Sequence, residues 1–342
     1  MDRNMILLCP VGRRSACYVM GGILTEAIRR GDAILGWMPP GTAKTPADQV
    51  TPNEIWAQWP GLHLLYERHK IPSHAIWVAP AGEAPPISIP AVQIDYVWDL
   101  LHQAPQRDVA LAFTTALQRT LYERCWGSLP AHAIIGSPML PPLSQQTSPS
   151  TLIYFLPKFK PGWRRWTTRV AAWQVLYAAH RAARRWGFEF VVKTRDKHGW
   201  LPGVTRLADA VIRDRQDGIL WPSPTQRLLT NAALVIHFQG GAGLEANARG
   251  IPAISVLTPL TPNLPAYWKP ILRLKRAIVS PWPGLSQEGS TKEVLRWLRD
   301  PLPSASQFAI RQFRDLLIGP MEPTEWMPPL QDLCKRVSRQ CC

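Results

Sequence analysis

Between Thr151 and Leu257 the sequence alternates short apolar runs with longer stretches of helical periodicity. Strand–helix alternation over such a length favours parallel strands, because each crossover returns the chain to the same end of the sheet. We therefore predict an α/β domain whose parallel sheet is covered on both faces. The expected strands are 151–156, 188–193, 218–221, 233–238 and 252–257; the expected helices are 167–186, 205–213, one capped by Ser223 and opened by Pro224, and 241–249.

The helix expected over 167–186 has a periodic set of apolar residues that we place on the side facing the sheet. These residues are Val170, Trp173, Val175, Leu176, Ala179 and Ala183. Further on, Ser290-Thr-Lys-Glu293 is typical of a capping box, and it predicts a helix from there to Arg299. A last helix is expected over about 304–317.

The first half opens in the same way, with an apolar strand at 5–9, a loop at 10–15 and a helix at 19–30 that ends at Gly31. Such an opening predicts a second parallel α/β unit. Its other expected strands are 33–37, 75–79, 92–96 and 131–135, and its other expected helices are 53–59, 61–69 and 109–124.

The chain has 342 residues, which is more than a single core usually supports, so two domains are expected. Residues 139–150 are rich in Pro, Ser and Gln, and are typical of a linker. We predict domains over 1–140 and 151–300, a linker at 141–150, and a C-terminal helix and tail over 301–342.

The formal net charge is +15, which favours an acidic partner: nucleic acid, an anionic membrane surface, an acidic glycan or a phosphorylated substrate. A basic protein without such a partner is the alternative. The six cysteines form no CxxC pair, which argues against a disulfide framework and a zinc site. The terminal pair Cys341-Cys342 lacks the prenylation pattern, and we interpret it as a frayed tail.

The apolar run from Met5 to Val11 is short and interrupted by Pro10, so it fits neither a signal peptide nor a membrane span. No stretch of 18 apolar residues occurs. We expect a cytoplasmic protein whose membrane contact, if any, is peripheral at the inner face.

The most informative segment is Leu234-Val-Ile-His-Phe-Gln-Gly-Gly-Ala-Gly-Leu-Glu-Ala-Asn-Ala-Arg-Gly-Ile-Pro-Ala-Ile-Ser255. It predicts a strand, a glycine turn at Gly240 and Gly241, a helix ended by Gly250, and another strand. The free N–H groups and positive dipole end of that helix favour an anionic guest such as a pyrophosphate. Glu245, one turn into the helix, is placed to accept from ribose hydroxyls. A glycine turn required only for packing is the alternative.

Three cations follow the strand at 188–193. Lys193, Arg195 and Lys197 alternate, so they share one face of an extended chain, and they lie at the carboxyl end of a strand, where open α/β sheets bind ligands. A diphosphate would neutralise them. A solvated charge run at a strand exit is the alternative.

The stretch from Lys158 to Arg169 alternates cations with aromatic residues. This composition suits contact with nucleic acid, and equally suits a membrane surface where Trp lies at the level of the headgroups. We predict acceptor or polyanion contacts here, unless the stretch only covers a sheet edge. The candidate residues are Lys158, Lys160, Trp163, Arg164 and Arg165.

The segment LLTNAALVIHFQGGAGLEANARGIPAISV resembles the donor site of GT-B glycosyltransferases and their epimerase relatives. The match lies in the small-residue turn, the Glu245-Ala246 pair, and Gly250-Ile-Pro252 before the next strand. The nearest likeness is to bacterial surface-carbohydrate and CDP-glycerol-transferase-like proteins. The turn of that family usually carries serines; here glycines replace them, which leaves backbone contacts to phosphate.

Two more segments match the same family. Ile134-Ile-Gly-Ser-Pro138 resembles the end of its first domain, and Val191-Val-Lys-Thr-Arg-Asp-Lys-His198 resembles a basic segment of its second domain. The resemblance spans roughly residues 130–260, and reaches the first domain only through Gly12-Arg13-Arg14. It implies an α/β fold of two Rossmann-like domains facing each other across a cleft, with C-terminal helices crossing back.

The resemblance also implies roles for individual residues. We expect the donor to contact Lys193, Arg195, Lys197, His198, Gln239, Gly240, Gly241, Ala242, Gly243 and Glu245. In the first domain, Gly12, Arg13 and Arg14 follow the first strand and face the cleft. The general base needed for transfer is sought in loops of the first domain. Asp95 is favoured because it ends a predicted strand, and the other candidates are Asp99, His69, His63 and Glu67.

No Asp-x-Asp motif occurs, so we expect no metal site and no cofactor; the nucleotide sugar is a substrate, and the helix dipole and cations stabilise the leaving group. The favoured acceptor is an envelope glycan or a lipid-linked sugar. A hydroxymethylated DNA base is a second candidate, because of the net charge. A nucleotide-sugar epimerase and a non-catalytic nucleic-acid-binding protein remain as other classes.

Overall fold

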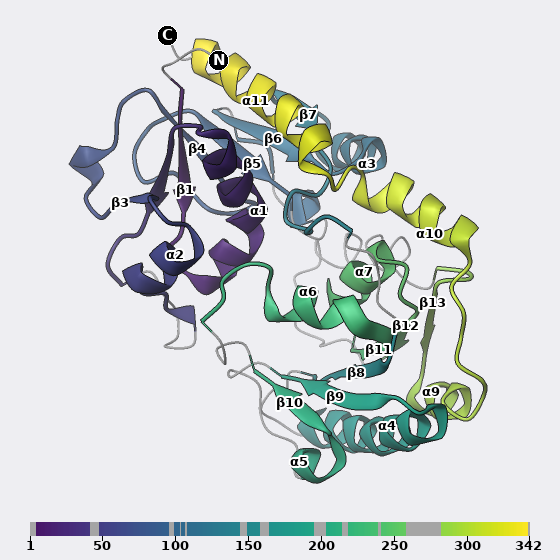
Figure 1. The fold of residues 1–342 in the computed structure, drawn as a ribbon. Coiled ribbons are helices and arrows are strands. Elements are labelled where there is room, and N and C mark those ends of the chain that lie inside the picture. Colours follow the sequence, from purple (N-terminus) through teal and green to yellow (C-terminus); the bar gives the residue numbers. More distant parts are fainter. Residues whose placement is uncertain are drawn as a thin grey trace. The chain divides into compact units, whose positions relative to one another are not determined.

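A computed structural model describes residues 5–41, 48–95, 99–102, 104–106, 108–143, 149–157, 164–194, 203–213, 218–238, 241–257 and 282–340. The chain divides into two compact units. Unit 1 comprises residues 1–142, 218–223 and 315–342, and unit 2 comprises residues 143–217 and 224–314. Each unit contains one parallel sheet (Figure 1).

In the described part of unit 1 the sheet order is β3-β2-β1-β4-β5-β6-β7, and all pairs are parallel. The strands are β1 (Ile6–Pro10), β2 (Ile34–Trp37), β3 (His63–Leu65), β4 (Ala75–Pro80), β5 (Ala91–Ile94), β6 (Val109–Phe113) and β7 (His132–Ile134). The helical elements are α1 (Arg14–Arg30), α2 (Pro52–Gln58), η2 (Arg68–Lys70), η3 (Asp99–His102), α3 (Ala116–Trp126) and α11 (Pro323–Gln340).

In the described part of unit 2 the order is β10-β9-β8-β11-β12-β13, again all parallel. The strands are β8 (Thr151–Phe155), β9 (Glu189–Lys193), β10 (Ala210–Ile212), β11 (Ala232–His237), β12 (Ala253–Val256) and β13 (Ser286–Gly289). The helical elements are α4 (Arg164–Trp186), α5 (Val204–Leu207), α6 (Pro224–Leu228), η4 (Leu229–Asn231), α7 (Gly241–Ala248), α9 (Thr291–Trp297) and α10 (Gln307–Phe313), followed by the π-helical segment η5 (Arg314–Ile318), which leads into unit 1.

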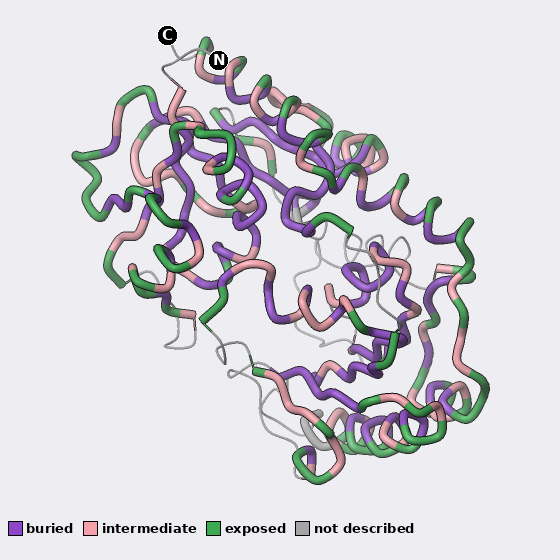
Figure 2. The backbone as a smooth tube through the Cα atoms, in the orientation of Figure 1, coloured by how far each residue is buried: buried purple, intermediate pink, exposed green. Residues whose placement is uncertain are grey.

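The sheet of unit 2 is covered on both faces, as its apolar strands require. Leu152 and Tyr154 of β8 pack with the inner side of α4, whereas Ile153 between them packs with Ala246 of α7. Side chains alternate across a strand, so one strand supplies both layers. Figure 2 shows the central strands of both sheets buried along most of their length.

The core of unit 1 draws on three separate parts of the chain. Leu7 of β1 and Met20 of α1 pack with Leu220 from the 218–223 segment and with Trp326 and Leu333 of α11. The C-terminal part of unit 1, residues 315–342, also lies close to the end of β7. Gly136 has φ +83°, and a Cβ there would lie 2.2 Å from the Pro320 carbonyl oxygen; Ser137 Oγ donates to the Ile318 carbonyl at 2.7 Å.

Several expected elements are wrong. The helix expected at 61–69 is strand β3 followed by η2, and the helix expected at 109–124 is strand β6 followed by α3. In each case a short apolar run fits either period, and pairing with a neighbouring strand decides the outcome. The helix expected at 205–213 is one turn, α5, followed by β10 along β9.

One further expectation fails for a tertiary reason. The strand expected at 218–221 is not a strand: these residues belong to unit 1, where Leu220 is buried in the core. The helix expected over about 304–317 is present as α10 and η5. A further helix, α11, follows it and was not expected, because Pro328 and Pro329 lie inside it.

The register of α4 also differs from expectation. Val175, Leu176, Ala179 and Ala183 are buried as expected, but Val170 and Trp173 are 51% and 39% exposed. Both lie on the outer side of the helix, away from the sheet.

Candidate functional site

The strand order of unit 2 has a switch point between β8 and β11. From β8 the chain continues outward to β9 and β10, and from β11 it continues outward in the other direction to β12 and β13. Loops that follow the two central strands therefore diverge, and the carboxyl ends at such a switch point are where open α/β sheets bind ligands. The glycine turn follows β11 at this point.

The turn brings a histidine against a helix start. His237 is the last residue of β11, and α7 begins at Gly241. A Cβ on Gly243 would lie 2.2 Å from His237 Nε2, so only glycine lets the imidazole lie over the first turn of α7. Gly241 and Ala242 are partly exposed in that turn. Gln239 and Gly240, which we also expect to contact the donor, lie outside the described residues.

His237 is buried, and burial lowers its pKa to about 4. The ring is therefore neutral at pH 7, with one nitrogen able to donate a hydrogen bond and the other able to accept one. His237 is not among the site residues predicted from the sequence. The available signal was a polar residue that ends the apolar run Leu234-Val-Ile immediately before a glycine turn.

A row of polar residues crosses the sheet at the level of His237. His237 is in register with Ser255 of β12, and Ser255 is in register with Glu288 of β13. Ser255 Oγ donates to Glu288 Oε2 at 3.1 Å. His237 and Ser255 are buried and Glu288 is half-buried. Burying polar side chains is costly for a core, so their grouping at the carboxyl edge marks that edge as a candidate site. We call His237, Ser255 and Glu288 the polar row.

Glu245 lies one turn into α7 and is buried, as is Asn247. Burial lowers the pKa of Arg249, one turn further on, and the Glu245 carboxylate opposes that shift. Arg314 Nε donates to the Ala248 carbonyl at 2.6 Å, at the end of α7. The helix thus has a carboxylate within it, two guanidinium groups toward its C-terminus, and glycines at its N-terminus. The role of Glu245 toward ribose stays a prediction.

Lys193 is the last residue of β9, beside β8. Its side chain is buried, and Nζ donates to the Thr194 carbonyl at 2.9 Å. A buried ammonium at the carboxyl edge of the sheet agrees with the predicted anion site. In this structure, however, the ammonium donates to the backbone carbonyl of the next residue, Thr194. Arg195, Lys197 and His198 lie outside the described residues, as do Lys158, Lys160 and Trp163; Arg164 and Arg165 open α4, but their side chains are not described.

Unit 1 has a corresponding switch point between β1 and β4, and Gly12, Arg13 and Arg14 follow β1 there. Both arginines are already paired with carboxylates: Arg13 with Glu83, which follows β4, and Arg14 with Glu54 of α2. Arg14 is buried, and its Nε and Nη1 atoms have no hydrogen-bond partner among the described residues.

Burial would lower the pKa of Arg14, but the hydrogen bond and charge of Glu54 outweigh it and raise that pKa. Burial would likewise raise the pKa of Glu54, but bonds from the Thr51 amide and from Arg14 hold it below its usual value. The pair is therefore ionised at neutral pH.

Three of the candidates for the general base occupy different places. Asp95 follows β5, is buried, and accepts from the Leu100 amide at 2.9 Å. Asp99 opens η3, but its side chain is not described. His69 is exposed on η2, with Nε2 3.2 Å from a carboxylate oxygen of Glu67. It follows β3, four strand spacings or about 19 Å from β5, so the structure does not bring His69 and Asp95 together.

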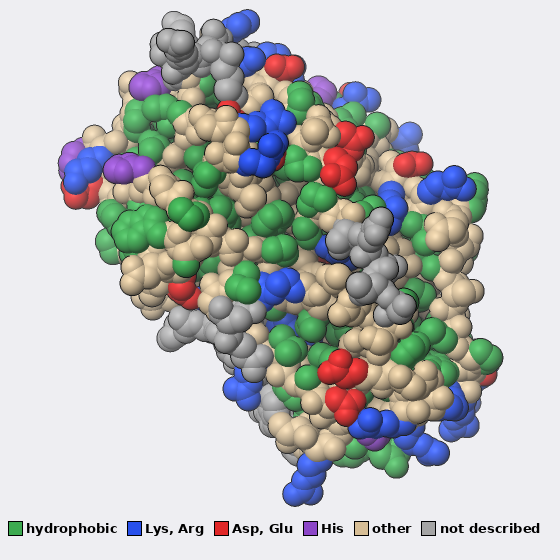
Figure 3. All heavy atoms as spheres, in the orientation of Figure 1, with side chains coloured by type: hydrophobic (Ala, Val, Ile, Leu, Met, Phe, Trp, Pro, Cys, Tyr) green, Lys and Arg blue, Asp and Glu red, His purple; other side chains and the backbone are tan. Residues whose placement is uncertain are grey.

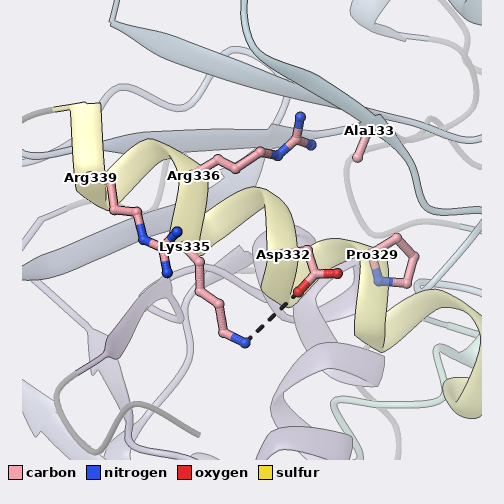
Figure 4. Close-up of a pocket in the computed structure, with 6 residues that line it drawn as sticks. All are labelled: Ala133, Pro329, Asp332, Lys335, Arg336 and Arg339. Atoms are coloured by element: carbon pink, nitrogen blue, oxygen red, sulfur yellow. Dashed lines mark ion pairs between the residues drawn. The ribbon is translucent and has the colours of Figure 1, made fainter.

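A shallow cavity of about 600 Å³ lies elsewhere in unit 1, on the outer side of α11 beside β7 (Figure 4). None of the predicted site residues lines it. Lys335 Nζ lies 3.8 Å from Asp332 Oδ1, and Arg336 donates to the His132 carbonyl at 2.9 Å. With Arg339, these cations occupy the last turns of a helix, where its negative dipole end favours them.

Within the described ranges, no group of three or more His, Cys, Asp or Glu side chains is arranged to hold a metal ion. A search of the same residues finds no helix with the length and hydropathy needed to cross a bilayer. The buried thiols of Cys9, Cys17 and Cys334 are free.

No protein-family model matches this chain, and no curated protein matches it. Solved structures match along its whole length. CalG4, the calicheamicin glycosyltransferase, is 14% identical with a TM-score of 0.51, and the match covers 98% of this chain and 100% of CalG4. UGT89C1 from Arabidopsis thaliana, solved with UDP-L-rhamnose, is 10% identical with a TM-score of 0.56, and the match covers 100% of each chain. The wall teichoic acid polymerase TagF is 10% identical with a TM-score of 0.56, and 100% of this chain and 90% of TagF are covered.

The chain has the GT-B fold. The fold expected from the glycine-turn segment and its flanking strands is therefore confirmed. At 10–14% identity the GT-B likeness concerns the fold alone. The polar row, Lys193 and the start of α7 lie at the carboxyl edge of the second GT-B sheet.

Proposed function

We propose that this GT-B chain is a glycosyltransferase that moves a sugar or polyol phosphate from a nucleotide-activated donor to a hydroxyl of a polyanionic acceptor. The observation that carries the proposal is the carboxyl edge of the unit 2 sheet. The start of α7 follows the topological switch point there, buried His237 and Ser255 lie at the ends of β11 and β12, and a buried Lys193 ends β9. The named solved structures of the same fold are a glycosyltransferase, a protein complexed with UDP-L-rhamnose and a polymerase of wall teichoic acid.

The donor diphosphate would bind at the start of α7. Free backbone N–H groups and the helix dipole favour the anion there, and the absence of a side chain at Gly241 lets it approach the backbone. Neutral His237 places a polar ring beside this helix start without adding charge. Lys193 would supply positive charge at the end of β9, two strands from β11, and so stabilise the departing nucleotide. That nucleotide is a nucleoside diphosphate when a sugar is transferred, and a nucleoside monophosphate when a polyol phosphate is transferred.

The acceptor hydroxyl needs a base, and Asp95 is the candidate we favour. It is a buried carboxylate at the carboxyl end of β5 in unit 1, whereas His69 is exposed beyond the opposite edge strand. A carboxylate within hydrogen-bond reach of the hydroxyl takes up the proton as the new bond forms.

For the acceptor we favour an envelope glycan or a lipid-linked sugar over DNA. TagF, a polymerase of wall teichoic acid, supports the glycan. The net charge of +15 supports a second candidate, a hydroxymethylated base in DNA. Strong, salt-dependent binding to unmodified duplex DNA would favour the second.

The direct test is a thermal-shift screen of the purified chain with UDP, CDP, GDP and TDP. A ligand of the folded state at about 100 times its Kd stabilises it by about 2.7 kcal/mol. We expect one diphosphate to raise the Tm, and Lys193→Met to remove most of that rise. The matched control is Lys292→Met, which removes an exposed lysine of α9 in the same unit and should keep the response.

Stabilisation by none of the four diphosphates would contradict the proposal. A rise that Lys193→Met and Lys292→Met leave equally intact would place the nucleotide elsewhere. With a binding nucleotide known, the matching nucleotide sugar is tested for hydrolysis and transfer, and Asp95→Asn should abolish transfer while keeping the nucleotide response.

A further inference from the structure

The net positive charge of the chain comes from one of its two units. By sequence, unit 1 contains 14 Lys and Arg against 15 Asp and Glu, a net charge of −1. Unit 2 contains 25 Lys and Arg against 9 Asp and Glu, a net charge of +16. A surplus of this size is larger than binding of a nucleotide diphosphate requires, and it favours a larger anionic partner for unit 2.

The long helix of unit 2 presents a continuous outer stripe, which we call the α4 outer face: Val170, Trp173, Tyr177, Arg181 and Arg184. The spacings of three and four residues place these side chains on one side of the helix. Val170, Trp173 and Tyr177 are 51%, 39% and 47% exposed, and both arginines are exposed as well. In Figures 1 and 3, α4 forms the outer border of unit 2, with Lys and Arg side chains beside hydrophobic ones.

The stripe is ordered along the helix. The rings of Trp173 and Tyr177 stack with centroids 6.0 Å apart and an interplanar angle of 30°. Arg181 follows one turn later, and Arg184 pairs with Asp209 at 2.6 Å while most of its side chain stays exposed. The opposite side of α4 is buried in the core through Ala172, Val175, Leu176 and Ala179. A rotation of α4 that covered Val170, Trp173 and Tyr177 would expose these core residues instead.

A single exposed apolar side chain is ordinary, but three within two turns form a patch that a soluble surface usually avoids. Trp and Tyr suit a boundary between apolar and aqueous surroundings, and arginines attract anionic headgroups. Binding of single-stranded nucleic acid requires a groove with free aromatic platforms. Here the surface is the outside of a helix, and the two rings stack on each other.

We propose that the α4 outer face docks onto an anionic phospholipid bilayer, with the helix axis along the surface. Val170, Trp173 and Tyr177 enter the headgroup region, and Arg181 with the excess charge of unit 2 holds the protein to acidic lipids. The docking requires no donor and no transfer reaction, so it stands or fails independently of the proposed function. It deepens that function in one respect: it puts the acceptor hydroxyl on a lipid-linked molecule.

The test is flotation of the full chain with phosphatidylcholine vesicles prepared with and without phosphatidylglycerol. The wild type should float only with the anionic vesicles. Trp173→Ser combined with Tyr177→Ser should lower the partition coefficient about tenfold or more. Arg181→Glu should lower it about tenfold as well, and high salt should remove the difference that this variant makes.

The matched controls are Phe308→Ser and Arg311→Glu, which change an exposed Phe (68%) and an exposed Arg on α10 of the same unit. Both lie outside the α4 outer face, so both should bind within about twofold of the wild type. Their changes in charge and hydropathy resemble those of the test variants, so a difference between the two sets reports position alone. Trp173 also packs near Gly203, before α5. Tyr177→Ser alone is therefore included, with thermal melting to show that each variant is folded.

Failure of the wild type to float with anionic vesicles would overturn the proposal, as would equal losses for the α10 variants and the α4 variants. Loss of duplex DNA binding in the α4 variants, without any vesicle binding by the wild type, would assign the face to nucleic acid instead. In each of these cases the nucleotide response measured by thermal shift is unaffected, so the proposed function is tested separately.

Discussion

Both units place a loop and a helix start after the central strand of a parallel sheet, but they handle charge at that point differently. In unit 1, Arg13 and Arg14 follow β1, and each is matched by a carboxylate from a neighbouring segment. In unit 2, a neutral histidine ends β11, glycines follow it, and the unit as a whole has a large surplus of cations. The same sheet geometry thus supports an internally neutralised edge and an edge suited to an external anion.

The largest effect is expected from breaking the pair in unit 1. Glu54→Gln keeps the shape and an acceptor for the Thr51 amide, but leaves the buried guanidinium of Arg14 without its counter-charge. Loss of one partner of a buried pair costs about 3 kcal/mol, which urea denaturation will measure. Addition of Arg14→Met should restore much of the stability. Equal stability of Glu54→Gln and the wild type would show that the pair is not needed for folding.

The next effect sharpens the comparison through pH. His237 has a folded pKa of about 4, below its ordinary value of 6.5, so folding favours the neutral ring. Its stabilising contribution is complete above about pH 6.5, and is lost as the pH falls toward 4. Between about pH 8 and pH 5 the wild type should lose about 2 kcal/mol more than His237→Gln. Urea melts at the two pH values measure the difference, with the exposed His69→Gln as control; parallel losses would contradict burial of a neutral ring.

A smaller effect tests the contact behind the glycine turn. Gly243→Ala places a Cβ against the His237 ring, and overpacking should outweigh the gain in helix propensity, for a net loss of about 1.5 kcal/mol. The same substitution in a His237→Ala background should be neutral or stabilising. The coupling from this double-mutant cycle, measured by denaturation, checks the contact. Additive effects would mean that the two residues do not touch.

The smallest effect compares one motif in the two units. Thr51 caps α2 in unit 1 and Ser290 caps α9 in unit 2, each in a capping box with Glu at the third position. Each Ala substitution should cost about 1 kcal/mol. If the units unfold separately, calorimetry should show each variant lowering a different transition; a single transition lowered equally by both would show that they unfold together.

Strands and helices could be predicted from the sequence where the periodic pattern of apolar residues was strong. The strands around β8, β9, β11 and β12 were predicted because each is a short apolar run bounded by glycine, proline or a clear helix. The helix after the glycine turn was predicted from Gly241 and Gly250. Where an apolar run stood next to an amphipathic one, as at Val109–Phe113, the two merged into one expected helix.

The site was predicted in part because its chemistry is local. A glycine turn before a helix is visible in one segment, and so is a lysine that ends a strand. The polar row was not predictable, because His237, Ser255 and Glu288 are brought together only by the register of three strands. The pairing of Arg14 with Glu54 depends in the same way on tertiary contact across 40 positions. The exposure of Trp173 reflects the register of α4, which a long helix with apolar residues on several sides leaves ambiguous.

The way the two units share the chain has a consequence for the order in which they mature during synthesis. Unit 2 is complete once residue 314 has left the ribosome. Between residues 143 and 314, only the six residues 218–223 belong to unit 1 instead. Unit 1 starts first, yet its core still awaits Trp326, Leu330 and Leu333 of α11. The domain that is translated first is therefore the last to close, and a ribosome that stops short of α11 leaves the N-terminal domain, not the C-terminal one, unfinished.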